Sequence, residues 1–141
     1  MSKHRIKLSF LLIALFLASL ACEFSGSTAS IKDAWLAHDP DGEEPTIIFM
    51  QDETLYCVVK LANAPDETDV KIIWTALEAE GIAPDTVLSE NEYSGANSTI
   101  TFRLNHSQLW PVGKYKADLY LDNQLDQTLE FTVYPLETAE P

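Results

Sequence analysis

The sequence contains few cysteines. Only Cys22 and Cys57 occur among 141 residues, so the chain can hold at most one internal disulfide and has no paired C-x-x-C zinc ligands. No H-x-x-x-H or G-x-S-x-G pattern is present, which leaves a zinc enzyme or an α/β-hydrolase without sequence support. We therefore expect no catalytic residue, no metal site and no cofactor, and a protein that is not an enzyme.

Basic residues are also scarce. The chain has 9 Lys and Arg against 22 Asp and Glu, a net charge of −13. Three of the basic residues, Lys3, Arg5 and Lys7, lie in the first 21 residues, which hold no acid, so the rest of the chain has a net charge of −16. Such a surface repels nucleic acid and anionic lipid headgroups. We expect no nucleic-acid partner.

No apolar run is long enough to cross a membrane. The longest spans residues 8–21, whereas a membrane-spanning helix needs about 20 apolar residues. Behind a short basic start, this run is typical of a signal peptide, which we place at residues 1–21. Export permits disulfides, and it places the remaining chain outside the cytoplasm.

The junction Ser19-Leu20-Ala21-Cys22 resembles the lipobox of bacterial lipoproteins. In that family the cysteine carries a diacylglyceryl group and becomes the first residue after cleavage. The resemblance implies that Cys22 is lipidated and holds the protein at the cell membrane or envelope. Ser19 and Ala21 also satisfy the rule for ordinary signal cleavage, so a secreted, unlipidated protein is the alternative. Residues 22–30 are small and polar, and we expect them to form a flexible tether.

Short alternating runs separated by turn residues fill residues 31–134 at a spacing close to ten residues. This pattern predicts one small sandwich or barrel, followed by an acidic tail at residues 135–141. In the clearest run, residues 54–61, Leu55, Cys57, Val59 and Leu61 face one way. Residues 70–77 also fit one face of a helix, but their β-branched start favours a strand. We expect strands at residues 31–37, 46–50, 54–61, 70–77, 98–104, 114–121 and 125–133, and a weak edge strand within 84–90.

Three residues make this pattern resemble immunoglobulin-like and fibronectin type III-like domains. Cys57 falls on the second long strand, Trp74 falls on the next, and Tyr115 follows a Trp-Pro-Val-Gly-Lys corner. The resemblance implies a single all-β sandwich of about seven strands in which Trp74 is buried and Tyr115 closes the corner with a hydrogen bond to the backbone. It also implies that Cys57 and Ala117 face each other across the core without a disulfide. A fold of this kind does not by itself indicate an activity.

The same arrangement predicts a candidate binding face. If Trp74 points into the core, five residues on the third, penultimate and last strands point outward: Ile73, Leu77, Lys116, Tyr120 and Tyr134. We expect this face to bind another envelope protein, which would make the chain a non-catalytic adaptor. The alternative is a carbohydrate or small-ligand module that uses an exposed aromatic ring, Trp35 or Trp110, as a stacking platform.

Overall fold

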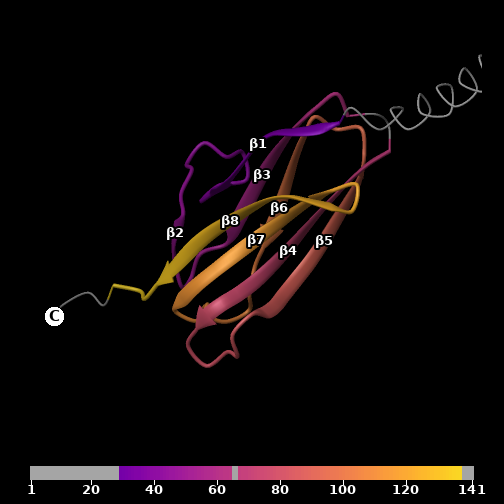
Figure 1. Ribbon diagram of the computed structural model, residues 1–141. Coiled ribbons are helices and arrows are strands. Elements are labelled where there is room, and N and C mark those ends of the chain that lie inside the picture. Colours follow the sequence, from indigo (N-terminus) through magenta and orange to yellow (C-terminus); the bar gives the residue numbers. More distant parts are fainter. Residues whose placement is uncertain (1–28, 65–66, 138–141) are drawn as a thin grey trace, which may run out of the picture.

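The computed structural model describes residues 29–64 and 67–137, which form eight strands (Figure 1). The expected signal peptide, Cys22 and most of the expected tether lie outside the described residues, as does the end of the acidic tail. Among the described residues, no helix is long and apolar enough to span a membrane. The strands are β1 (Ser30–Ala37), β2 (Ile48–Met50), β3 (Leu55–Ala62), β4 (Thr68–Ala79), β5 (Thr86–Gly95), β6 (Thr99–Leu104), β7 (Gly113–Leu121) and β8 (Gln124–Tyr134).

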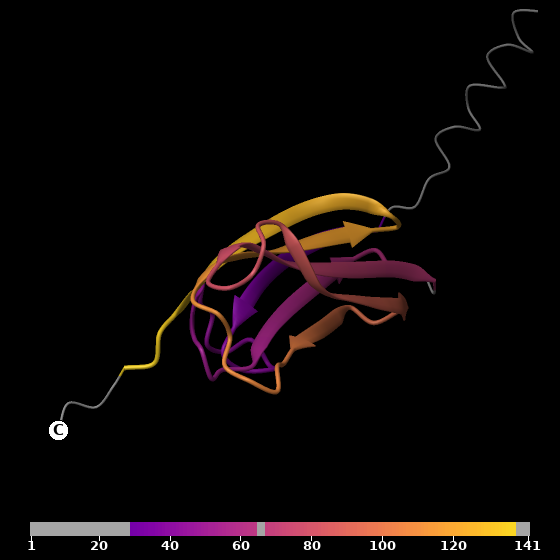
Figure 2. The same ribbon diagram turned by 90° about the horizontal axis from the view of Figure 1, so that it is seen from below.

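The strands form two sheets that pack as layers (Figure 2). One sheet has the order β1-β3-β6, and the other has the order β2-β8-β7-β4-β5. The chain changes sheets between β1 and β2, because β1 pairs antiparallel with β3 whereas β2 pairs parallel with β8. This arrangement confirms the expected all-β sandwich of the immunoglobulin-like type.

The core lies between the two layers and follows the alternation of the sequence. All four inward residues of the 54–61 run are buried, and Trp74 is fully buried on β4. Phe131 is the centre of an aromatic cluster, with ring centroids 6.1 Å from Trp74 and 5.4 Å from Tyr115. Within the described part of the chain, Trp74 Nε1 has no hydrogen-bond partner. Leaving a buried donor unpaired costs about 1–3 kcal/mol, so the fit of the indole ring must offset this loss.

The tyrosine corner forms as expected. The Tyr115 hydroxyl donates a hydrogen bond to the Pro111 carbonyl, and its ring is buried. Cys57 and Ala117 are both fully buried, and Cys57 is a free thiol. Burial raises the pKa of Cys57 to about 12 and that of Tyr115 to about 12, because a buried site disfavours the charged form of each group.

Two expectations about strand boundaries need correction. Residues 70–77 belong to a twelve-residue strand that pairs with β5 on one side and β7 on the other, so the helical alternative is wrong. The weak edge strand expected within 84–90 is instead a ten-residue strand, Thr86–Gly95. Its polar sequence hid its length, because an edge strand packs little of its surface and needs no strong apolar alternation.

Two local features also differ from expectation. The turn before β8 contains only Asp122 and Asn123, which have φ values of 47° and 66°, so Gln124 already belongs to β8. Such positive φ angles are typical of a tight two-residue hairpin turn. Val58 lies between the inward residues Cys57 and Val59, so alternation places it on the outer face of β3, yet it is only 2 % exposed. A Cβ placed on Gly42 would lie 2.9 Å from Val58, so the Gly42 turn covers this side chain.

Candidate functional site: the outer face beside β2 and β8

The five residues of the predicted face lie on three neighbouring strands of the large sheet. Ile73 pairs with Asp118, and Lys116 pairs with Thr75 on β4 and Glu130 on β8. Alternation with the buried Trp74, Ala117, Leu119 and Val133 directs Ile73, Lys116, Tyr120 and Tyr134 outward. Leu77 lies at an irregularity of the β4–β7 pairing, between Ala76 and Glu78. Tyr120 lies near the β7–β8 hairpin, whereas Tyr134 lies where β8 ends.

The centre of this face is occupied by interactions within the sheet. Lys116 Nζ lies 3.0 Å from Asp118 Oδ2, and Thr128 Oγ1 donates to the other carboxylate oxygen at 2.5 Å. The hydrogen bond to Asp118 raises the pKa of Lys116 above its usual value. Lys71 Nζ lies 4.8 Å from the centroid of the Tyr120 ring. Lys116 and Tyr120 are therefore engaged with their own neighbours and are poorly placed to hold a partner.

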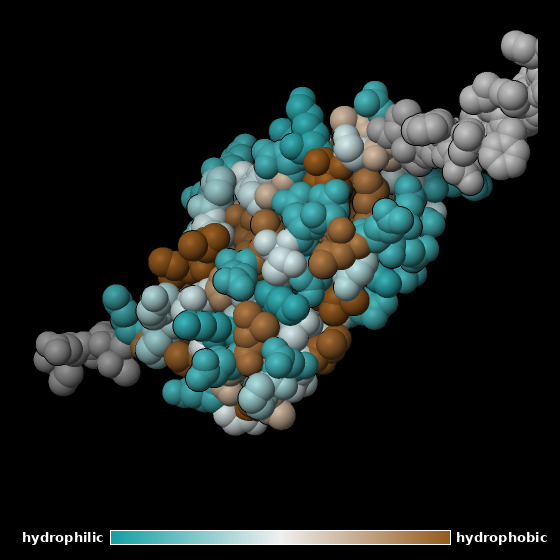
Figure 3. All heavy atoms as spheres, viewed as in Figure 1, coloured by the Kyte–Doolittle hydropathy of each residue, from teal (hydrophilic) through white to brown (hydrophobic). Residues whose placement is uncertain are grey.

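Exposed apolar residues instead gather where β8 ends. Ile47, Ile48 and Tyr134 are 65 %, 51 % and 47 % exposed. Figure 3 shows hydrophobic atoms projecting from the side of the molecule where Figure 1 places β2. We call the group formed by Ile47, Ile48, Leu77, Lys114 and Tyr134 the β2–β8 surface.

Three hollows surround the β2–β8 surface. Two of them, of about 560 and 490 Å³, share Lys114 and Tyr134 as lining residues. The third, of about 540 Å³, lies on the other side of Ile47, between β1 and β8. Ile47 thus forms a ridge between two grooves, which gives a partner both a projection and recesses to contact.

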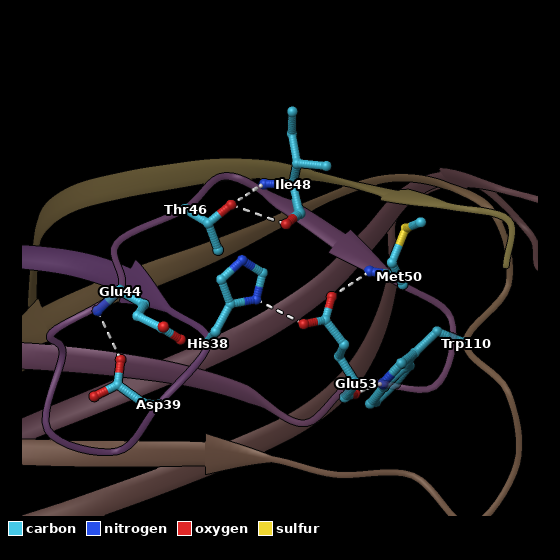
Figure 4. A network of polar contacts seen from close by, with 8 residues as sticks. All are labelled: His38, Asp39, Glu44, Thr46, Ile48, Met50, Glu53 and Trp110. Carbon is cyan, nitrogen blue, oxygen red and sulfur yellow. Dashed lines mark hydrogen bonds and ion pairs between the residues drawn. The ribbon is translucent and has the colours of Figure 1, made fainter. Parts of the chain in front are cut away.

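The backbone of β2 explains why Ile48 points outward. Phe49 is fully buried, and successive side chains of a strand point to opposite faces. Thr46 Oγ1 accepts a hydrogen bond from Ile48 N and donates one to Ile48 O, both at 2.9 Å (Figure 4). Glu53 accepts a hydrogen bond from Met50 N at 2.5 Å. These side chains satisfy the polar groups along the edge of β2 that does not pair with β8.

Glu53 also links β2 to two rings (Figure 4). Its other carboxylate oxygen lies 2.6 Å from His38 Nδ1, and its backbone carbonyl accepts a hydrogen bond from Trp110 Nε1 at 2.8 Å. Trp110 is only 4 % exposed. The expectation that Trp110 could act as an exposed stacking platform is therefore wrong, because this ring holds the β6–β7 loop against the β2–β3 turn.

Trp35 keeps part of its ring accessible. Its Nε1 donates to the Gly42 carbonyl at 3.0 Å, and Lys60 Nζ lies 5.3 Å from the ring centroid. The residue also lines the groove beside Ile47. Trp35 is thus the one of the two proposed platforms that can still contact a ligand.

No metal-binding group of three or more His, Cys, Asp or Glu side chains occurs within residues 29–64 and 67–137. The acidic β1–β2 loop serves a local structural role. The Asp39 carboxylate accepts hydrogen bonds from the backbone of Glu43 and Glu44 at 3.0 and 2.8 Å. The bond from Glu43 contributes most to lowering the pKa of Asp39.

Leu77 and Tyr134 belong to both the binding face predicted from the sequence and the β2–β8 surface, whereas the sequence did not single out Ile47, Ile48 or Lys114. A signal for the isoleucines was present: two apolar residues followed by Phe49 on a short strand cannot all face the core. No sequence pattern singles out Lys114, because it is distinguished only by the two hollows that it lines.

No family model matches this chain, and no curated protein matches its sequence. Among solved structures, an immunoglobulin-like protein from Pseudomonas aeruginosa is similar with a TM-score of 0.52 and 9 % identity, over 78 % of this chain and 99 % of that one. The alkylpurine DNA glycosylase AlkC from Pseudomonas fluorescens has a TM-score of 0.48 and 13 % identity over 77 % of this chain. A β-glucosidase from Listeria innocua has a TM-score of 0.47 and 16 % identity over 80 % of this chain. This chain spans 31 % of the glycosylase and 17 % of the glucosidase. The likeness to the Pseudomonas aeruginosa protein shows that the chain has an immunoglobulin-like fold.

Proposed function

We propose that this chain is a membrane-tethered, extracytoplasmic binding module that holds another envelope protein through its β2–β8 surface. The observation that carries the proposal is the convergence of Ile47, Ile48 and Tyr134 with three hollows. Exposed apolar groups beside recesses are typical of protein-interaction sites. The lipobox-like junction at Cys22 supports the tether.

The position of this surface fits a tethered module. β1 begins at one end of the sandwich, and β8 ends at the other (Figure 1). The β2–β8 surface lies where β8 ends, so it is far from the residue at which the tether joins the domain. A lipid on Cys22 would therefore attach the domain at the end away from this surface.

The tether is tested by the intact mass of the protein extracted with detergent from its own cell envelope. A mass equal to residues 22–141 plus a diacylglyceryl group, with or without a further acyl chain, supports it. The bare mass of residues 22–141 would instead support the secreted alternative. A disulfide between Cys22 and Cys57 is not expected even then, because Cys57 lies in the centre of the core.

The binding surface is tested by replacing Ile47 and Ile48 with Asp in the tethered protein. Recovery of a co-purifying envelope protein should fall at least tenfold, because the charges would enter an apolar contact. The matched control is Leu109→Asp with Leu125→Asp, since these side chains are 52 % and 56 % exposed and belong neither to the β2–β8 surface nor to β5. Equal recovery with both double variants would contradict the proposed surface.

A second candidate function, a carbohydrate or small-ligand module, rests on Trp35 in the groove beside Ile47. Trp74 and Trp110 are buried, so Trp35 would supply any change in tryptophan fluorescence that a ligand in this groove produces. A titration with a glycan panel that changes the fluorescence, and does not do so in Trp35→Phe, would favour this function. No change with any glycan would leave the protein-binding proposal in place.

A further inference from the structure

The two edges of the five-stranded sheet are treated differently. At one edge, Thr46 and Glu53 occupy the polar backbone groups of β2 (Figure 4). At the other edge, β5 has β4 as its only neighbour within the sheet (Figure 1). Alternate residues of such a strand direct their N–H and C=O groups away from the sheet. A ten-residue strand therefore offers a row of hydrogen-bonding groups to another chain.

Two of the usual devices that block an edge strand, proline and lysine, are missing from β5, which does carry the charged residues Glu90 and Glu92. Proline and lysine do not occur between Thr86 and Gly95, and the only irregularity in its pairing lies near its start, opposite Trp74 and Thr75. The side chains of Ser89 and Tyr93 form hydrogen bonds with Asn91 Oδ1 and Asn97 N, whereas Thr46 and Glu53 bond to the backbone of β2. Natural proteins commonly protect long edges with such features. The middle and end of β5 are left open.

The charge of β5 selects what can pair with it. Glu90 and Glu92 are exposed, and their register opposite Ile73 and Lys71 places both on the outer face. Lys71 Nζ lies 3.8 Å from Glu90, a weak surface ion pair that leaves most of the acidic character in place. If two copies of β5 paired antiparallel about Asn91, Glu90 of each would lie opposite Glu92 of the other. Like charges in this position destabilise strand pairing, which disfavours a second copy of this chain.

We propose that the open edge of β5 binds an extended, basic segment of a partner protein, which adds as a sixth strand with Lys or Arg side chains opposite Glu90 and Glu92. Main-chain hydrogen bonds supply the pairing, and the two carboxylates select the charge of the segment. The net charge of −16 beyond residue 21 increases the rate at which a basic segment approaches. This site lies at the opposite edge of the sheet from the β2–β8 surface and goes beyond the function proposed above.

The test uses three kinds of synthetic peptide against the full chain. The first has the sequence of β5 with lysines in place of the two glutamates, and the second is the unaltered β5 sequence. The third kind is a pair of lysine peptides that carry N-methyl groups on the odd-numbered or the even-numbered residues. We expect the lysine peptide to bind at least tenfold more tightly than the unaltered one, with changes in NMR amide shifts concentrated on β5. One N-methylated peptide should lose binding and the other keep it, because only alternate N–H groups face β5.

Variants of the protein complete the test. Glu90→Lys combined with Glu92→Lys should reverse the preference, so that the unaltered β5 peptide binds more tightly. The matched control is Glu78→Lys with Glu80→Lys, which changes the net charge equally at two other exposed residues and should preserve the preference for the lysine peptide.

Three results would overturn strand addition at β5. These are equal binding of both N-methylated peptides and the parent, no binding of the lysine peptide, or loss of the preference in the control variant. Amide shifts confined to the β2–β8 surface would also refute this inference while supporting that surface as a binding site. Recovery of an envelope protein by the Ile47 and Ile48 variant tests only the proposed function of the β2–β8 surface. The proposed function and the inference about β5 can therefore fail separately.

Discussion

At the scale of single residues, Tyr115 links burial to a specific hydrogen bond. Its hydroxyl donates to the Pro111 carbonyl at the corner before β7. Tyr115→Phe removes this donor and keeps the ring, so we expect a loss of about 1–2 kcal/mol in the free energy of unfolding. Urea denaturation followed by tryptophan fluorescence measures this loss. An unchanged urea midpoint would mean that the corner bond contributes nothing to stability.

The same residue predicts a response to alkaline pH. The pKa of Tyr115 is raised from 10.0 to about 12, so the folded protein holds the phenolic proton more tightly than the unfolded chain does. The corresponding stabilisation is fully present below pH 10 and disappears as the pH rises to about 12. We expect Tyr115→Phe to lose less stability than the wild type between these pH values. Parallel pH profiles of the two proteins would contradict this assignment.

A third residue-scale prediction concerns the missing disulfide. The immunoglobulin-like resemblance implies that Cys57 and Ala117 face each other across the core, and both are fully buried. Ala117→Cys should form a disulfide with Cys57 under oxidising conditions and stabilise the fold by about 4 kcal/mol, the entropic estimate for a loop of this length. Thiol titration and urea denaturation, each with and without reductant, measure this. Ala117→Ser is the control for the change in core volume, and two free thiols after oxidative refolding would show that the geometry is unsuitable.

At the scale of strands, Gly113 is required by the close approach of β7 to the end of β4. Its φ is 155°, and a Cβ there would lie 2.1 Å from the Glu78 carbonyl oxygen. Gly113→Ala should therefore cost at least about 2 kcal/mol, because the β4 backbone must move. Gly81→Ala is the control, since Gly81 also has a positive φ of 75° but open space around it. Equal losses of stability in thermal unfolding would mean that backbone strain, and not the contact, sets the cost.

The strands that could be predicted are those whose sequence pattern matches their burial. β3 alternates clearly because one of its faces packs on the core, and Cys57, Trp74 and Tyr115 carried the resemblance to immunoglobulin-like domains. The full length of β5 could not be predicted, because an edge strand has little buried surface to select an alternating sequence. The hydrogen bonds that Thr46 and Glu53 form with the β2 backbone could not be predicted either. The local sequence does not show which backbone N–H and C=O groups an edge strand leaves unpaired.

The candidate site was only partly predictable for a related reason. Sequence alternation predicts which residues point away from the core, and on this basis we expected Leu77 and Tyr134 on the outer face. It does not show which outward residues are already paired. Asp118 engages Lys116, and Lys71 covers Tyr120, so two of the five expected residues are occupied within the sheet. The exposed part of the face lies instead around Ile47 and Ile48.

At the scale of the whole molecule, repulsion between negatively charged copies opposes self-association through the exposed apolar residues. The chain beyond residue 21 carries a net charge of −16, which should keep the protein monomeric at pH 7 and low salt despite the exposed Ile47 and Ile48. As the pH falls toward about 4, protonation of carboxylates removes this repulsion. We expect self-association to appear there in sedimentation velocity and to weaken in Ile47→Asp with Ile48→Asp. A dimer at pH 7 and low salt would contradict this balance.

The two ends of the domain also determine how it carries mechanical load. β1 begins at one end of the domain, where the proposed tether would join it, and β8 ends at the other, beside the proposed partner surface (Figure 1). Tension between a membrane anchor and a held partner would therefore run along the strands. β1 pairs with β3 from Ser30 to Ala37, so pulling on its start loads many hydrogen bonds in shear at once, and they cannot open one by one. A module built in this way resists extension until β1 slips, and β1 becomes the element whose strength sets the force that the attachment can bear.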